Sequence, residues 1–213
     1  MTHKLTPYGF ILLLAMAFVA NETHAAVSSK QTIVLATAPA LTQSYIWYDG
    51  DRERTVWLDP ALLMEFNSSD GAQSPLRKLL PGAKLHSTVG KNSRIWNLGN
   101  GVDPQVALQN LRTRKTIEKY SPVFHESPSS LSHKRALPGN MIVYLKPEWT
   151  QKEVDQWIKK NRLQVLQKMS FGPYVYLIHT PEGLDSLKQA NQLYQSGEVL
   201  AATPEWWEDL RVK

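Results

Sequence analysis

The sequence of 213 residues contains no cysteine. Disulfide bonds therefore cannot stabilise the protein, and a thiol nucleophile and a cysteine-ligated metal are both excluded. The sequence also lacks a Gly-rich phosphate loop, the Gly-x-Ser-x-Gly turn of serine hydrolases and the His-Glu-x-x-His pattern of zinc proteases. We therefore expect a protein that is not an enzyme and that needs neither a cofactor nor a metal.

Basic residues outnumber acidic ones, 24 to 19, so the formal net charge is +5. They are scattered along the chain, whereas a nucleic-acid-binding protein more often gathers them in one stripe beside aromatic side chains. We expect no nucleic-acid partner. A modest positive charge suits an acidic protein partner through electrostatic steering, and simple solubility explains it equally well.

Residues 1–25 have the layout of a secretory signal peptide. Lys4 gives the start a weak positive charge, and residues 9–20 form a run of 12 uncharged, mostly apolar residues. That run is too short to span a bilayer, and small residues predict cleavage between Ala25 and Ala26. We therefore expect a periplasmic or secreted protein with no membrane contact after cleavage; an uncleaved anchor is the alternative.

Residues 139–207 alternate between strand-like and helix-like patterns. The predicted strands are Met141–Leu145, Leu163–Lys168, Tyr174–His179 and Val199–Thr203, and the predicted helices are Thr150–Asn161 and Leu184–Ser196. Thr150 and Glu153 form a capping box, which marks a helix start. The order β-α-β-β-α-β predicts a ferredoxin-like α+β domain, with both helices on one face of a four-stranded sheet.

Residues 45–127 are predicted to form another α+β unit, which opens with a β-hairpin around Asp49-Gly50. The hairpin aromatics either pack across the strands or form a patch that binds a partner. The elements predicted after it are Ala61–Phe66, Ser74–Leu80, Ala83–Val89, Arg94–Leu98, a helix opening at Asp103-Pro104, and Pro122–Phe124. Their order is again β-α-β-β-α-β, which predicts a divergent second copy of the fold; one larger α+β domain is the alternative.

Three further segments lack helix or strand periodicity over most of their length. Residues 26–44 read as a mobile arm, residues 128–138 as a solvated linker, and residues 208–213 as a C-terminal tail. The basic run His133–Arg135 makes the linker a plausible site of proteolysis.

Several motifs of residues 137–207 follow one another in a characteristic order. They are a strand ending at Lys146-Pro147, Gly172 before a Tyr-rich strand, the helix segment 187–193 (LKQANQL), Ser196–Val199, and Pro204-Glu205-Trp206. This pattern resembles the N-terminal propeptides of subtilisin-like serine proteases. In that family the propeptide folds against the protease, templates its folding and inhibits it, with the propeptide tail in the substrate cleft.

The chain stops at Lys213, and no Gly-Thr-Ser-x-Ala nucleophile segment occurs in it. In this respect it resembles the trans-acting external chaperones of bacterial subtilisin/kexin-like serine proteases. The resemblance implies an exported chaperone and inhibitor that forms a 1:1 complex with such a protease. The alternative is a periplasmic adaptor or structural module that reuses the same fold, because a fold alone does not determine function.

The resemblance also implies which residues bind the protease. The tail residues Leu210, Arg211, Val212 and Lys213 are expected in the cleft, with Lys213 in the first specificity pocket and Leu210 in the fourth. A frayed charged terminus is the alternative for this tail.

A second contact is expected where the sheet packs on two parallel helices of the protease. Glu205 and Glu208, which follow the last predicted strand, would cap the N-termini of these protease helices. Trp206 and Trp207 lie between them in the sequence and are expected at the same surface. Side chains assigned to the solvent face of one strand would form the apolar anchor: Tyr174, Tyr176 and Ile178.

Overall fold

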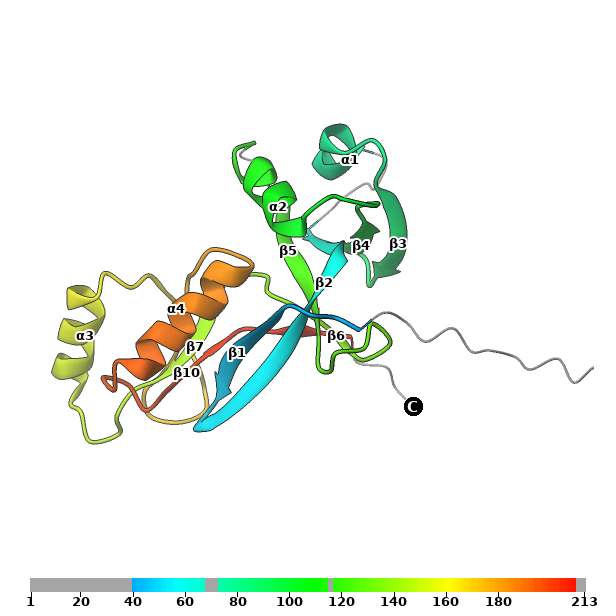
Figure 1. The fold of residues 1–213 in the computed structure, drawn as a ribbon. Helices are drawn as coiled ribbons and strands as arrows, with labels where there is room; N and C mark the ends of the chain where they lie inside the picture. Colours follow the sequence, from blue (N-terminus) through cyan, green and yellow to red (C-terminus); the bar gives the residue numbers. More distant parts are fainter. Residues whose placement is uncertain (1–39, 68–72, 115–116, 210–213) are drawn as a thin grey trace, which may run out of the picture. The chain divides into compact units, whose positions relative to one another are not determined.

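A computed structural model describes residues 40–67, 73–114 and 117–209 (Figure 1). The predicted signal peptide with its Ala25–Ala26 junction, most of the predicted arm, and the tail residues Leu210, Arg211, Val212 and Lys213 lie outside the described residues. The described chain is α+β, with antiparallel strands and few helices. None of its helices is long and apolar enough to cross a membrane.

The C-terminal unit contains six elements, each within two residues of its predicted bounds. They are β7 (Met141–Tyr144), α3 (Gln151–Lys160), β8 (Val165–Lys168), β9 (Val175–Ile178), α4 (Leu184–Gln195) and β10 (Ala201–Pro204). The strands form an antiparallel sheet in the order β10-β7-β9-β8. The predicted capping box is confirmed, because Thr150 and Glu153 each bond the other's backbone N–H.

Both helices of this unit lie on the same face of the sheet. Their apolar side chains meet those of the strands in one buried cluster, which includes Met141, Val143, Val154, Trp157, Tyr176, Ile178 and Ala190. Helix α3 and helix α4 thus bury one side of the sheet, and no helix of the described residues lies on the opposite side.

The N-terminal half forms a second sheet. Its elements are β1 (Ser44–Asp49), β2 (Arg52–Phe66), α1 (Pro75–Leu79), β3 (Lys84–Val89), β4 (Ser93–Asn97), α2 (Pro104–Arg112) and β5 (Lys119–His125). Apart from β1, the strands follow along the chain as β2, β3, β4 and β5, and they lie in the sheet in the order β5-β2-β4-β3. The last of the four thus lies beside the first, and the first beside the third, as in the order β10-β7-β9-β8 of the C-terminal sheet. The element order predicted for this half is therefore present, and both sheets connect their strands in the same way.

The second strand of the predicted hairpin continues into the predicted strand Ala61–Phe66, and together they form β2. Strand β2 runs for 15 residues, and its pairing with β5 shifts register between Leu58 and Leu63. Asp59 and Pro60 lie at that irregularity, where the Asp59 carboxylate accepts a hydrogen bond from the backbone N–H of Ala61 at 2.9 Å. A bulge accommodates the proline without ending the strand.

Part of the predicted linker belongs to the sheet, which corrects the expectation of a solvated connection. Strand β6 (Lys134–Ala136) pairs with β5 on one side and with β11 (Trp207–Glu208) on the other. Ala136 and Leu137 are fully buried, so this short segment gains both a strand partner and a place in the core. Strand β11 likewise places the start of the predicted tail in the N-terminal sheet.

Side chains connect the two halves at several points. The Nδ2 of Asn191 on α4 donates to the carbonyl of Ile46 on β1 at 2.7 Å, and the rings of Tyr48 and Tyr194 lie 4.4 Å apart. The Arg112 guanidinium at the end of α2 bonds Asp185 at the start of α4 at 2.6 Å. The described residues form one compact unit.

Candidate protein-binding face

The predicted solvent-facing anchor on β9 is wrong for two of its three residues. Tyr176 and Ile178 are only 5% and 1% exposed, because they lie in the cluster under α3 and α4. Their strand partners on β7, Val143 and Met141, belong to the same cluster. Tyr174, which precedes β9, is partly buried against that cluster too. The alternation along β9 is present, but its faces are the reverse of those expected.

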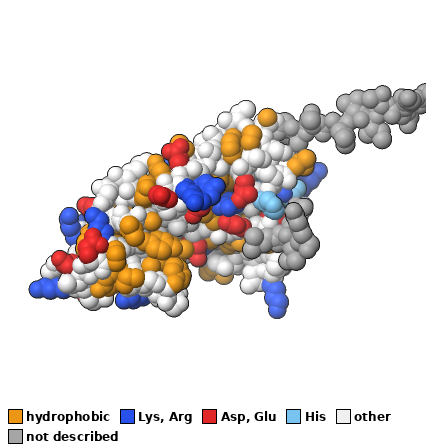
Figure 2. Space-filling model, turned by 90° about the horizontal axis from the view of Figure 1, so that it is seen from below, with side chains coloured by type: hydrophobic (Ala, Val, Ile, Leu, Met, Phe, Trp, Pro, Cys, Tyr) orange, Lys and Arg blue, Asp and Glu red, His pale blue; other side chains and the backbone are white. Residues whose placement is uncertain are grey.

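The face opposite the helices carries the other set of alternating side chains. Ile142 and Tyr144 on β7 and Leu177 on β9 point to this face and are half-buried. Phe171, 48% exposed, places its ring 6.3 Å from the ring of Tyr144. Figure 2 shows hydrophobic side chains gathered in one area on the left of the view, between charged ones. We call Ile142, Tyr144, Leu177 and Phe171 the outer patch.

The residues expected to cap protease helices bond within the chain. The Glu205 carboxylate accepts a hydrogen bond from Asn140 Nδ2 at 2.9 Å, and Glu208 forms an ion pair with Arg135 at 3.1 Å. Neither contact involves the outer patch. Within the described residues, therefore, both carboxylates hold the segment after β10 in place.

The two tryptophans expected at the protease surface also have internal partners. The Trp206 ring lies 5.4 Å from that of Trp47 and 5.8 Å from that of Phe124. Trp207 pairs with Ala136 in the sheet and packs against an apolar cluster of the N-terminal half. These contacts join the C-terminal unit to the other sheet, a role that the sequence did not reveal.

Arg135 is the centre of this junction. Its guanidinium carbon lies 5.3 Å from the Trp47 ring centre and 5.7 Å from that of Trp206. Its Nε donates to the Glu126 carboxylate at 2.9 Å, while a second nitrogen bonds Glu208. In the sequence, Arg135 stood out only as part of a basic run in the predicted linker. Its partners Trp47, Trp206, Glu126 and Glu208 all lie outside residues 128–138, so the linker sequence did not reveal them.

A buried acid–histidine pair lies at the β2 irregularity. Burial alone would raise the pKa of Asp59, but hydrogen bonds from His125 and from backbone amides outweigh it and lower that pKa. His125 Nε2 lies 2.9 Å from the Asp59 carboxylate, and its Nδ1 lies 3.2 Å from the Ser132 carbonyl. His125 is fully buried, so the pair ties β2 to β5 and to the segment around Ser132 in the protein interior.

A second buried acid organises the helix side of the N-terminal sheet. The fully buried Glu65 carboxylate accepts hydrogen bonds from Ser74 Oγ and Trp96 Nε1, both at 2.7 Å, and from the Tyr120 hydroxyl at 3.1 Å. Burial and the neighbouring Glu65 charge raise the pKa of Tyr120. Ser74 also caps α1, so Glu65 ties the start of that helix to three strands.

Among residues 40–67, 73–114 and 117–209, no three His, Asp or Glu side chains gather closely enough to hold a metal ion. No protein-family model, no curated protein and no solved structure matches this chain.

Proposed function

We propose that this chain is an exported protein that binds a subtilisin/kexin-like serine protease, assists its folding and inhibits it. In this proposal the C-terminal unit is a ferredoxin-like domain of the propeptide type. The observation that carries the proposal is the outer patch: two helices cover one face of the β10-β7-β9-β8 sheet, and the opposite face presents partly exposed apolar side chains.

The composition of the outer patch suits a protein interface. Aromatic residues are enriched at the centres of such interfaces, and Tyr144 and Phe171 already contact each other there. Strand β7 holds Tyr144 in place, and Phe171, in the bend between β8 and β9, lies against it, which limits the conformational entropy that binding costs. A small set of rigid apolar anchors is therefore ready to dock on a complementary surface, such as a pair of helices.

Binding of this kind accounts for assisted folding. A protein that binds the native-like form of a protease, and not its unfolded chain, stabilises the native form by about 2.7 kcal/mol when present at a hundredfold excess over Kd. Inhibition would come from the tail residues Leu210–Lys213, which we propose add to the protease cleft as an extended strand. The backbone N–H of Asp209 donates to the Lys134 carbonyl at 3.0 Å, which anchors the residue before this tail.

The experiment is a refolding assay. Denatured subtilisin-like proteases exported by the same organism are diluted into buffer with and without this protein, and the recovered activity and the complex are measured. We expect recovery with the wild type and at least a tenfold weaker complex for the double variant Tyr144→Ser/Phe171→Ser, which removes two aromatic anchors.

The matched control is Val106→Ser, which alters a side chain of similar exposure, 55%, on helix α2 of the other half. We expect this control to behave like the wild type. Equal binding by the outer-patch variant and the control would refute the proposed face. Failure of the wild type to bind any such protease would refute the proposed function. The alternative function, a periplasmic adaptor or structural module, would then remain.

That second candidate, a periplasmic adaptor or structural module, is favoured by one observation. The N-terminal half lies outside the stretch that resembles propeptides, yet it repeats the strand order of the C-terminal unit and is joined to it through Arg135 and Arg112. A molecule built from two such sheets suits a module that holds two partners. Recovery of complexes that contain no protease would support it.

A further inference from the structure

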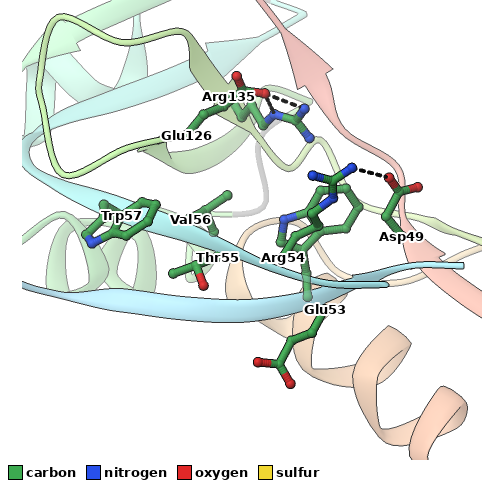
Figure 3. Close-up of a pocket in the computed structure, with 9 residues that line it drawn as sticks. Asp49, Glu53, Arg54, Thr55, Val56, Trp57, Glu126 and Arg135 are labelled. Carbon is green, nitrogen blue, oxygen red and sulfur yellow. Dashed lines mark hydrogen bonds and ion pairs between the residues drawn. The ribbon is translucent and has the colours of Figure 1, made fainter. Parts of the chain in front are cut away.

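A cavity of about 500 Å³ lies where the β1–β2 hairpin parts from β5 (Figure 3). Trp47 and Val56, both buried, form its apolar base, while Arg54, Glu126 and Arg135 line its rim. Figure 3 shows Arg54 rising from β2 toward the space beside Arg135. The cavity thus combines an apolar base with two guanidinium groups.

The edge of β2 that borders this cavity has no strand partner over a short stretch. Strand β2 pairs with β1 from Arg52 to Trp57, but its pairing with β5 begins only at Trp57. Among the described residues, Glu53 to Val56 therefore have a strand neighbour on one side only. Both Glu53 and Thr55 line the cavity.

The hydrogen-bond pattern between β1 and β2 shows which way the backbone N–H and C=O groups of Glu53–Val56 point. The N–H of Leu58 donates to the Gln43 carbonyl at 2.8 Å, so the even-numbered residues of this part of β2 bond β1. Because the pattern alternates, Glu53 and Thr55 direct their N–H and C=O groups to the opposite edge. On β1 the same alternation turns the carbonyl of Ile46 away from β2, where Asn191 donates to it.

The two edges of the hairpin therefore differ. Helix α4 contacts the outward carbonyl of β1 through Asn191, whereas the outward groups of β2 face the cavity. An open strand edge with backbone donors and acceptors is the feature that β-strand addition uses, with a pocket beside it to select side chains. Strand edge and pocket occur together here.

We propose that the β2 edge at Glu53–Val56 binds a short extended segment of a partner protein, which pairs with the backbone of Glu53 and Thr55 and places an aromatic side chain in the cavity. The Arg54 side chain is 50% exposed and, among the described residues, pairs only with Asp49, at 3.5 Å, so its planar guanidinium is available to stack on a ring. Trp47 and Val56 supply the apolar base for that ring.

The surroundings favour one short segment over extensive pairing. Arg52, Glu53 and Arg54 place charges along this edge, and charged side chains discourage the long, flat contacts that lead to aggregation. The end of the open stretch, where β5 joins β2 at Trp57, limits the inserted segment to a few residues. The proposal concerns the N-terminal half and does not rest on protease binding.

The test uses two capped peptides, acetyl-Thr-Val-Thr-Phe-Thr-Val-Thr-amide and the same peptide with serine in place of phenylalanine. The peptides are titrated into the full-length, ¹⁵N-labelled protein, and amide shifts locate the site. We expect the Phe peptide to bind at least tenfold more tightly than the Ser peptide and to shift the amides of Glu53 and Thr55.

Two proline variants make the test specific. Thr55→Pro removes an outward N–H without breaking the β1–β2 ladder, and we expect it to weaken binding about tenfold. Ser44→Pro removes an outward N–H on the opposite edge of the same hairpin and should leave binding unchanged. Equal thermal melting of the two variants shows that both fold.

Three results would overturn the proposal: no binding of either peptide at millimolar concentration, equal binding of both peptides, or equal binding by Thr55→Pro and the wild type.

Discussion

Replacement of Arg135 by alanine is expected to weaken the junction between the N-terminal sheet and the segment that follows β10, because this side chain contacts Trp47 on β1 as well as Trp206 and Glu208. Its guanidinium contacts two indole rings and two carboxylates, yet its side chain is only 14% exposed. The substitution removes all four contacts at once. It also leaves Glu126 and Glu208 near each other without the cation between them.

The magnitude follows from these contacts. A cation–π contact contributes about 0.5–1 kcal/mol at an exposed site and about 2 kcal/mol when desolvated, and we take about 1 kcal/mol for each contact of this largely buried side chain. Hydrogen bonds to charged groups contribute about 1.5–3 kcal/mol when buried, but less here because both carboxylates are about 40% exposed. We expect Arg135→Ala to lower the free energy of unfolding by about 2–4 kcal/mol. Arg135→Lys keeps the charge but loses the planar stacking, and should cost about half as much.

Urea unfolding followed by tryptophan fluorescence measures this loss, since Trp47 and Trp206 lie beside the guanidinium. A double-mutant cycle with Glu208→Gln isolates the ion pair, and we expect a coupling energy of about 0.5–1 kcal/mol. An alanine variant as stable as the wild type, within about 0.5 kcal/mol, would refute the role assigned to this cluster.

Two other predictions concern buried acids. Glu65→Gln should destabilise the protein by about 1–3 kcal/mol, because the amide presents N–H groups to side chains that donate to both carboxylate oxygens; an unchanged melting temperature would contradict it. The lowered pKa of Asp59 makes its contribution to stability fully present above the ordinary aspartate pKa of 3.8, and that contribution is lost as pH falls through the folded-state value. Asp59→Asn should therefore flatten the loss of stability below about pH 4, measured by thermal unfolding across pH. A variant that loses stability in acid as steeply as the wild type would show that Asp59 is not the group responsible.

Local signals in the sequence were sufficient to place most helices and strands. The capping box at Thr150 and the Asp103-Pro104 helix start satisfy backbone amides within a few residues, so they act whatever the rest of the chain does. Apolar periodicity likewise marked the strands and helices of the C-terminal unit. The order of elements in both halves could therefore be predicted from short-range chemistry.

The choice of face on β9 was not determined locally. Apolar residues occupy both sides of this strand, with Tyr176 and Ile178 on one and Val175 and Leu177 on the other. Alternation predicts that the faces differ, but not which of them is buried when both are apolar. The packing of α3 and α4 buries Tyr176 and Ile178. The candidate binding face is therefore the opposite face, with the outer patch.

Long-range partners were the other feature that only the tertiary structure decided. Asp59 and His125 are 66 residues apart in the chain, and the Glu208–Arg135 ion pair depends on the pairing of β11 with β6. Residues 134–136 and 207–208 are too short and too polar to be recognised as strands by periodicity. They became strands because each completes the hydrogen bonds of a neighbouring edge, and that edge exists only in the folded protein.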